Sequence, residues 1–155
     1  MSKAFTLTAV KAKAGGILHL VFADEATFDV DLNKVIQRHP TLAALADPAT
    51  FKRAKLGDWG RTVTWGTDDL ELAADNLRAR AVEQAGGYSH EGIVVWMHRH
   101  GMTQQQAADA LGLSRRMLGY YLSGEKPVPR VVALACIGWV HAVAPHNDER
   151  FALGA

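Results

Sequence analysis

The sequence predicts an α+β domain over residues 1–84, with a small antiparallel sheet and short helices, followed by an all-helical domain over residues 85–155. Apolar and polar residues alternate in parts of residues 5–31, as they do in half-buried strands, whereas apolar residues recur at helical spacing in the second half. The Ala-Gly-Gly segment at residues 85–87 separates these patterns, because adjacent glycines interrupt a helix. A length of 155 residues suits two small domains.

Turn-forming residues divide the first domain into short elements. Polar and glycine-rich segments at residues 13–16 and 23–26 separate three expected strands within residues 5–31. Asp31 can cap a short helix that Pro40 ends, because proline lacks the N–H group that a helix interior needs. The other expected elements are that helix at residues 32–38, a hairpin of strands at 52–56 and 61–65, and a helix at 70–82.

Four helices and no strand are expected in the second domain, and their end signals are strongest in its middle. Thr103 is a candidate N-cap, and Gln106, three residues later, can complete a capping box. Gly112 stands where a helix needs a left-handed residue to end, and Ser114 can cap the next helix. The four expected helices span residues 89–100, 103–111, 114–123 and 128–143.

The third of these helices combines a buried side with an exposed basic side. Leu118, Tyr121 and Leu122 share one face, because residues three and four apart are neighbours on a helix. Arg115 and Arg116 lie in the first turn, on the other side. Two short helices joined by a tight turn, with arginines at the start of the second, have the geometry that enters a DNA major groove. The guanidinium fork matches the O6 and N7 acceptors of guanine.

The charge distribution is compatible with such a contact. Residues 1–84 carry eleven basic and eleven acidic side chains, whereas residues 99–130 carry five basic and two acidic ones. This local positive excess suits a nucleic-acid contact without requiring one. A helix pair that serves only for packing is therefore an alternative.

Residues 89–143 resemble the lambda-repressor/Cro-like (XRE) family of helix-turn-helix domains. The residues that carry this resemblance are Thr103, Gln104, Ala108, Gly112, Ser114, Leu118, Tyr121, Gly124, Pro129 and Arg130. The resemblance implies an all-α, lambda-repressor-like DNA-binding domain. Departures from the family pattern at Ala107, Gly119 and Leu122 concern which bases are read.

The same resemblance implies two sets of DNA-binding residues. The set that would face the bases is Arg115, Arg116 and Tyr120. The set that would hold backbone phosphates is Gln104, Ser114 and Arg130.

The first domain is similar to a small bacterial α+β family, domain of unknown function 2442, over residues 5–80. The features that carry this similarity are the paired opening strands, Phe22-Ala23-Asp24 before Asp31-Leu32, the segment at residues 45–51, and Trp65 followed by Asp69-Leu70. Members of that family occur fused to helix-turn-helix domains. The resemblance implies a partner-binding or dimerisation role, and makes an antitoxin-type role toward a small toxin-like protein conceivable.

Several classes of protein are not expected from this sequence. No apolar run reaches the roughly 18–20 residues of a membrane span, and the N-terminal residues lack the pattern of a secretory signal. The single cysteine, Cys136, cannot form an internal disulfide, so a cytoplasmic location is expected. His98 and His100 point apart on a helix, so no metal site is expected. No cofactor and no catalytic residue are expected.

The last expected helix is apolar on nearly all sides between Val131 and Val143. Such a helix either lies at the centre of its bundle or contacts a second subunit, and both are expected here. The predicted function is therefore a dimeric, sequence-specific DNA-binding transcriptional regulator of bacterial type, with no enzymatic activity. The alternatives are an antitoxin-type adaptor whose helix-turn-helix serves autoregulation or packing only and, last, an enzyme in the first domain.

Overall fold

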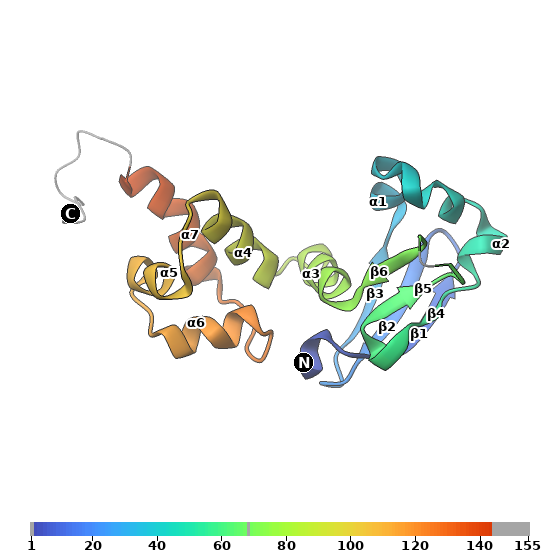
Figure 1. The fold of residues 1–155 in the computed structure, drawn as a ribbon, viewed down its shortest axis with the longest axis horizontal. Coiled ribbons are helices and arrows are strands. Elements are labelled where there is room, and N and C mark those ends of the chain that lie inside the picture. Colours follow the sequence, from blue (N-terminus) through green and yellow to red (C-terminus); the bar gives the residue numbers. More distant parts are fainter. Residues whose placement is uncertain (1, 68, 144–155) are drawn as a thin grey trace. The chain divides into compact units, whose positions relative to one another are not determined.

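The computed structural model of the protein describes residues 2–67 and 69–143. The chain divides into two compact units, Met1–Gly87 and Tyr88–Ala155. The first is built around antiparallel strands and the second from helices (Figure 1). The expected α+β arrangement, a small antiparallel sheet region followed by several helices, is thereby confirmed.

The two units divide after Gly87, slightly beyond the expected position between residues 84 and 85. After the last helix of the first unit, the chain turns back toward that helix. The N–H of Gly87 donates to the carbonyl of Val82 at 2.9 Å. The glycine pair therefore ends the helix that it follows. Residues 144–155 of the expected second domain lie outside the described residues.

The first sheet has three antiparallel strands in the order β1-β2-β3. They are β1 (Leu7–Lys13), β2 (Ile17–Phe22) and β3 (Thr27–Asp31), and a short 3-10 helix, η1 (Lys3–Phe5), precedes them. Alternate residues of β2 are buried, namely Leu18, Leu20 and Phe22, as the alternating pattern predicts. The three strands expected within residues 5–31 are confirmed.

A second three-stranded antiparallel sheet has the order β4-β5-β6. Its strands are β4 (Lys55–Leu56), β5 (Thr62–Thr64) and β6 (Glu71–Ala73), with a 3-10 turn, η3 (Asp58–Gly60), between the first two. The expected hairpin is present with shorter strands. The helix expected at residues 70–82 is wrong at its start, because residues 71–73 pair with β5 and the helix, α3 (Ala74–Gln84), begins only after them.

Three short helical elements follow β3: α1 (Asn33–Arg38), η2 (Pro40–Ala46) and α2 (Pro48–Phe51). The N-cap of α1 is Leu32, not Asp31 as predicted. The carboxylate of Asp31 instead accepts hydrogen bonds from the backbone N–H and the side-chain amide of Asn33, at 2.8 and 2.7 Å. The helix thus begins one residue later than expected, and Asp31 holds its first residue from the position before the N-cap.

One apolar core joins the elements of the first unit. It contains the inward side chains of the first sheet, Val63 and Trp65 near β5, and Ala74, Leu77 and Ala81 of α3. The indole N–H of Trp65 donates to the carbonyl of Phe51 at 3.0 Å, so this buried donor has a partner. The apolar periodicity predicted for α3 is therefore used for packing.

The described part of the second unit, residues 88–143, contains four helices, α4 (His90–Arg99), α5 (Gln104–Leu111), α6 (Arg115–Leu122) and α7 (Arg130–Val143). All four expected helices are confirmed to within two residues. Over the same residues no strand is present, as expected, apart from one isolated antiparallel bridge between Tyr88 and Val128. The buried core is Ile93, Trp96, Ala107, Ala108, Leu118, Tyr121, Val132 and Cys136.

Among the described residues, none of the helices combines the length and the apolar character needed to cross a membrane.

Candidate nucleic-acid interface

Local signals in the sequence account for the ends of α5 and α6. The Thr103 hydroxyl accepts from the N–H of Gln106 at 3.2 Å, and the Gln106 side chain accepts from the N–H of Thr103 at 2.9 Å. Gly112 ends α5 with φ 70°, in the left-handed region. The Ser114 hydroxyl accepts from the N–H of Met117 at 3.1 Å and caps α6. The predicted capping box, left-handed glycine and serine cap are confirmed.

Small side chains let α5 and α6 pack closely. Ala107 and Ala108 are completely buried, and they belong to the same core as Leu118 and Tyr121 of α6. The N–H of Leu113 donates to the carbonyl of Ala108 at 2.9 Å, which closes the turn between the helices. The burial of Leu118 and Tyr121 fixes which side of α6 faces the core.

The opposite side of α6 carries the residues predicted to face DNA bases. Arg115 and Arg116 are exposed, and Tyr120, one helical turn after Arg116, is half-buried. Because the first two residues of α6 are arginines, their side chains start at the helix end that enters a groove in helix-turn-helix docking. Within the described residues, Arg115 makes no hydrogen bond or ion pair with the protein.

The predicted phosphate contacts stand at the starts of three different helices. Gln104 is the first residue of α5, Ser114 precedes α6, and Arg130 is the first residue of α7, and all three are exposed. No hydrogen bond among the described residues joins Gln104 or Arg130 to α6.

Arg116, Tyr120 and Lys126 form a contact cluster at this surface. The Nε of Arg116 donates to the Tyr120 hydroxyl at 2.7 Å, and its guanidinium carbon lies 5.5 Å from the ring centroid. The Lys126 ammonium lies 4.8 Å from the same centroid. Cations over an aromatic face are attracted by the negative face of the ring. Tyr120 thus contacts two cations at once, and its hydroxyl is engaged by Arg116.

Lys126 is the member of this cluster that the sequence analysis did not single out. Its backbone N–H donates to the carbonyl of Tyr120 at 3.1 Å, which brings the chain after Gly124 back to α6. Gly124 has φ 75°, the conformation that permits this return. The sequence signal was the glycine after an expected helix, but the side chain's position over Tyr120 depends on the turn geometry.

His100, at the end of α4, lies beside two tryptophans. The His100 ring packs edge-on against Trp139, with ring centroids 4.8 Å apart, and against Trp96 at 6.4 Å. Among the described residues, no group of three or more histidine, cysteine or acidic side chains could hold a metal ion.

Three comparisons relate this chain to known proteins. The family described as Protein of unknown function (DUF2442) matches residues 7–83. The predicted resemblance of the first domain is therefore confirmed. The curated protein Alpha-muurolene synthase of Coprinopsis cinerea is 26% identical over 106 residues, which are 68% of this chain. The chain spans only 21% of that protein's length, so the match says nothing about a shared activity.

The comparison with a solved structure covers both units. The crystal structure described as Putative DNA Binding Protein NE0471 from Nitrosomonas europaea ATCC 19718 is 40% identical to this chain, with a TM-score of 0.81. The similarity covers 92% of this chain and 90% of that one. The chain therefore belongs to the same family as this Nitrosomonas europaea protein, with a DUF2442 region as its N-terminal part.

Proposed function

We propose that the protein is a dimeric, sequence-specific transcriptional regulator that binds double-stranded DNA through a lambda-repressor/Cro-like helix-turn-helix formed by α5 and α6. The observation that carries the proposal is the exposed pair Arg115 and Arg116 in the first turn of α6, on the side opposite the buried Leu118 and Tyr121. The description of the Nitrosomonas europaea relative as a DNA-binding protein supports it.

Arg115 and Arg116 have different roles in this proposal. Arg116 is positioned by Tyr120, which uses its Nε and leaves both terminal amino groups for the O6 and N7 acceptors of a guanine. Arg115 has no partner among the described residues and adapts to the neighbouring base pair or to a phosphate. The ring and hydroxyl of Tyr120 act through Arg116, so Tyr120 is a positioning residue.

The proposed phosphate contacts accompany the base contacts of α6, which we call the reading helix. Gln104, Ser114 and Arg130 contribute as predicted, and Lys126 joins them, with its ammonium held near α6 by its contact with Tyr120. The Ser114 hydroxyl accepts a hydrogen bond from Met117, which leaves its own proton for a phosphate oxygen. Such contacts fix the orientation of the protein on the duplex and carry no sequence information.

Dimerisation would occur through α7. Four aliphatic side chains are exposed along this helix: Val131 is 71% and Ile137 57% exposed, and Leu134 and Val140 are exposed as well. Exposed apolar groups gathered on one helix are typical of an interface. A two-fold dimer would place two reading helices about one DNA turn apart, so that both contact the major groove.

A second candidate function is an antitoxin-type adaptor, and one observation in the first unit favours it. Trp59 is 85% exposed and has φ 58°, a left-handed conformation that is costly for a tryptophan. Gly60 holds this loop against β1, because a Cβ there would lie 2.1 Å from the carbonyl oxygen of Leu7. Tryptophan is one of the residue types enriched among those that contribute most of the binding energy in protein interfaces.

Fluorescence anisotropy on duplex DNA tests the leading proposal. The full chain should bind a random duplex at about 50 mM salt and bind it far more weakly at about 200 mM, because phosphate contacts release counterions. Selection from a random DNA pool should then yield a preferred site. The double variant R115A/R116A should bind this site no more tightly than it binds random duplex. The control is Arg53→Ala, which removes an exposed cation of the first unit. A wild-type chain with no affinity for random or selected duplex contradicts the proposal and favours the adaptor.

A further inference from the structure

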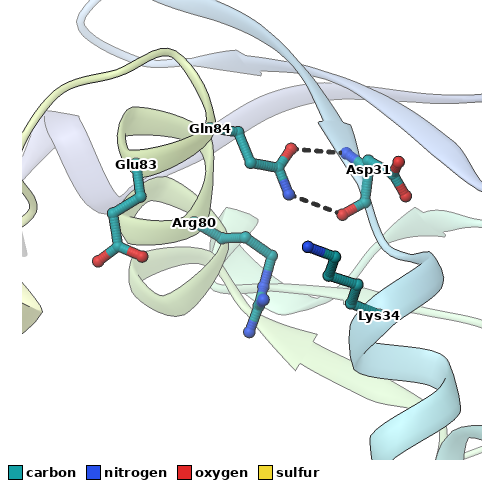
Figure 2. A pocket seen from close by; sticks show the side chains of 5 residues that line it. All are labelled: Asp31, Lys34, Arg80, Glu83 and Gln84. Atoms are coloured by element: carbon teal, nitrogen blue, oxygen red, sulfur yellow. Dashed lines mark hydrogen bonds between the residues drawn. The ribbon is translucent and has the colours of Figure 1, made fainter.

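The first unit contains a polar pocket that the proposed DNA contact does not use. It has a volume of about 450 Å³ and lies between the end of β3, the start of α1 and the last turns of α3. Figure 2 shows the five side chains that line it, which are Asp31, Lys34, Arg80, Glu83 and Gln84.

One wall of this pocket is held by a reciprocal pair of hydrogen bonds. The Gln84 side chain accepts from the N–H of Asp31 and donates to its carbonyl, both at 2.8 Å (Figure 2). This contact joins the last residue of α3 to the last residue of β3, although the two are far apart in the sequence. The Gln84 amide keeps a second hydrogen that this pair does not use. The wall is therefore ordered and still offers a donor.

Two cationic side chains from different helices share the pocket without a partner. Lys34 of α1 and Arg80 of α3 both line the pocket (Figure 2). Neither makes a hydrogen bond or an ion pair with any described residue. One of the two acids that line the pocket, Asp31, accepts hydrogen bonds from Asn33 at 2.8 and 2.7 Å with its carboxylate. Two like charges that line one pocket repel each other, and an anion between them lowers that repulsion.

We propose that this pocket binds a small phosphate group, either free or as a phosphomonoester. The planar guanidinium of Arg80 matches two oxygens of a phosphate, and the Lys34 ammonium supplies a second charge for a dianion. The spare amide hydrogen of Gln84 supplies a neutral donor. The volume admits a molecule larger than phosphate itself.

Isothermal titration calorimetry of the full chain tests this site. The probes are inorganic phosphate and glycerol 3-phosphate, with glycerol and sodium chloride of equal ionic strength as ligands that lack the phosphate. Wild type should bind both phosphates, and Arg80→Gln and Lys34→Gln should each lower the affinity by about tenfold or more. Binding of free phosphate alone would identify the ion as the ligand, whereas tighter binding of glycerol 3-phosphate would identify the ester.

Matched variants separate this site from other cations. Lys55→Gln removes an exposed cation of the same unit outside the pocket, and R115A/R116A removes the cations proposed to bind DNA. Both should bind phosphate as wild type does, so loss of DNA binding and loss of the pocket are independent results. Equal affinity of wild type, R80Q and K34Q, or a heat signal that sodium chloride reproduces, overturns the proposal. If R80Q lacks the far-UV circular dichroism of wild type, K34Q on exposed helix α1 decides alone.

Discussion

The Nε of Arg116 donates a hydrogen bond of 2.7 Å to the hydroxyl of Tyr120, four residues later on α6. The centroid of the same ring lies 4.8 Å from the ammonium of Lys126, a residue of the turn that follows the helix. An exposed arginine side chain normally samples many rotamers, and ordering it on a ligand costs conformational entropy. Contact with Tyr120 limits that freedom before DNA is bound, so part of the cost is met in the free protein.

Tyr120→Phe isolates this positioning effect, because it removes the hydroxyl and keeps the ring. We expect the affinity for the selected duplex to fall by about 1 kcal/mol, the usual contribution of one hydrogen bond, while affinity for random duplex changes little. Anisotropy titrations with the two duplexes measure the difference. Tyr88→Phe, which lies outside α6, is the control. Equal losses on both duplexes would show that Tyr120 contacts phosphate instead.

Arg115 and Arg130 should respond differently to truncation. Arg115→Ala should cost about 1–3 kcal/mol on the selected site and relax the preference at one or two base pairs. Arg130→Ala should weaken all duplexes alike and reduce the slope of log affinity against log salt by about one. Lys126→Ala should behave like the second variant. Competition with point-substituted sites, at two salt concentrations, distinguishes these outcomes, and identical profiles for R115A and R130A would contradict the assigned roles.

Gly112 and Gly119 form a matched pair for stability. Neither has an atom within 4 Å of the position that a Cβ would occupy, but only Gly112 has a positive φ, 70°. Gly112→Ala should therefore lower the free energy of unfolding by about 1–2 kcal/mol through backbone strain alone. Gly119→Ala should raise it by up to about 1 kcal/mol, because alanine favours a helix interior. Chemical denaturation measures both, and a loss of stability in G119A would mean that α6 is not helical there.

Asp24 should make the stability of the first unit sensitive to acid. Burial raises the pKa of this carboxyl, but hydrogen bonds and charge from Arg78 outweigh it, and the folded pKa lies below the ordinary value of 3.8. The two side chains form a bidentate pair at 3.0 and 2.9 Å. Because the pKa of Asp24 is lower in the folded than in the unfolded protein, its ionised carboxylate stabilises the folded state at pH values above the unfolded pKa. This stabilisation is lost as the pH falls through the folded pKa.

Asp24→Asn should therefore lower the free energy of unfolding at pH 7 by about 1–3 kcal/mol and flatten its decline in acid. Urea unfolding between pH 7 and pH 2 measures this decline. Asp58→Asn, at an exposed aspartate with no ion pair among the described residues, should follow wild type across the range. Parallel curves for D24N and wild type would show that the Arg78 contact contributes nothing to stability.

The exposed aliphatic side chains of α7 predict that a charge placed among them lowers the molecular mass of the protein in solution. Ile137→Glu should convert a dimer to a monomer, because it places a charge among four exposed aliphatic side chains. Sedimentation equilibrium measures the mass, and cooperative binding to a two-half-site duplex should disappear with it. Val94→Glu on α4 substitutes a valine of similar exposure and should leave the mass unchanged. A wild-type monomer at all concentrations would contradict dimerisation through α7.

Local residue chemistry was sufficient for much of the second unit. The capping box of Thr103 and Gln106, the left-handed Gly112 and the Ser114 cap each depend on residues within a few positions of one another. Their free energies are determined locally, so they can be read without knowing the tertiary structure. The same holds for the three glycine- or turn-bounded strands of the first sheet.

Pairing over longer distances decided what the sequence analysis missed. Leu70 has helical spacing to Ala74 and Leu77, yet residues 71–73 pair with β5, because long-range hydrogen bonding outweighs a weak local preference. Gln84 likewise joins α3 to β3 by hydrogen bonds to Asp31, a contact over 53 residues that no local signal predicts.

By itself, the sequence determined the order of a small sheet and a helical unit, the ends of α5 and α6, and the side of α6 that carries Arg115 and Arg116. These follow from periodicity and from caps, which act over one or two helical turns. Only the tertiary structure decided that Lys126 returns to the ring of Tyr120, and that two unpaired cations line one pocket. Such contacts depend on where turns and crossings bring separate segments, and no local preference specifies that distance.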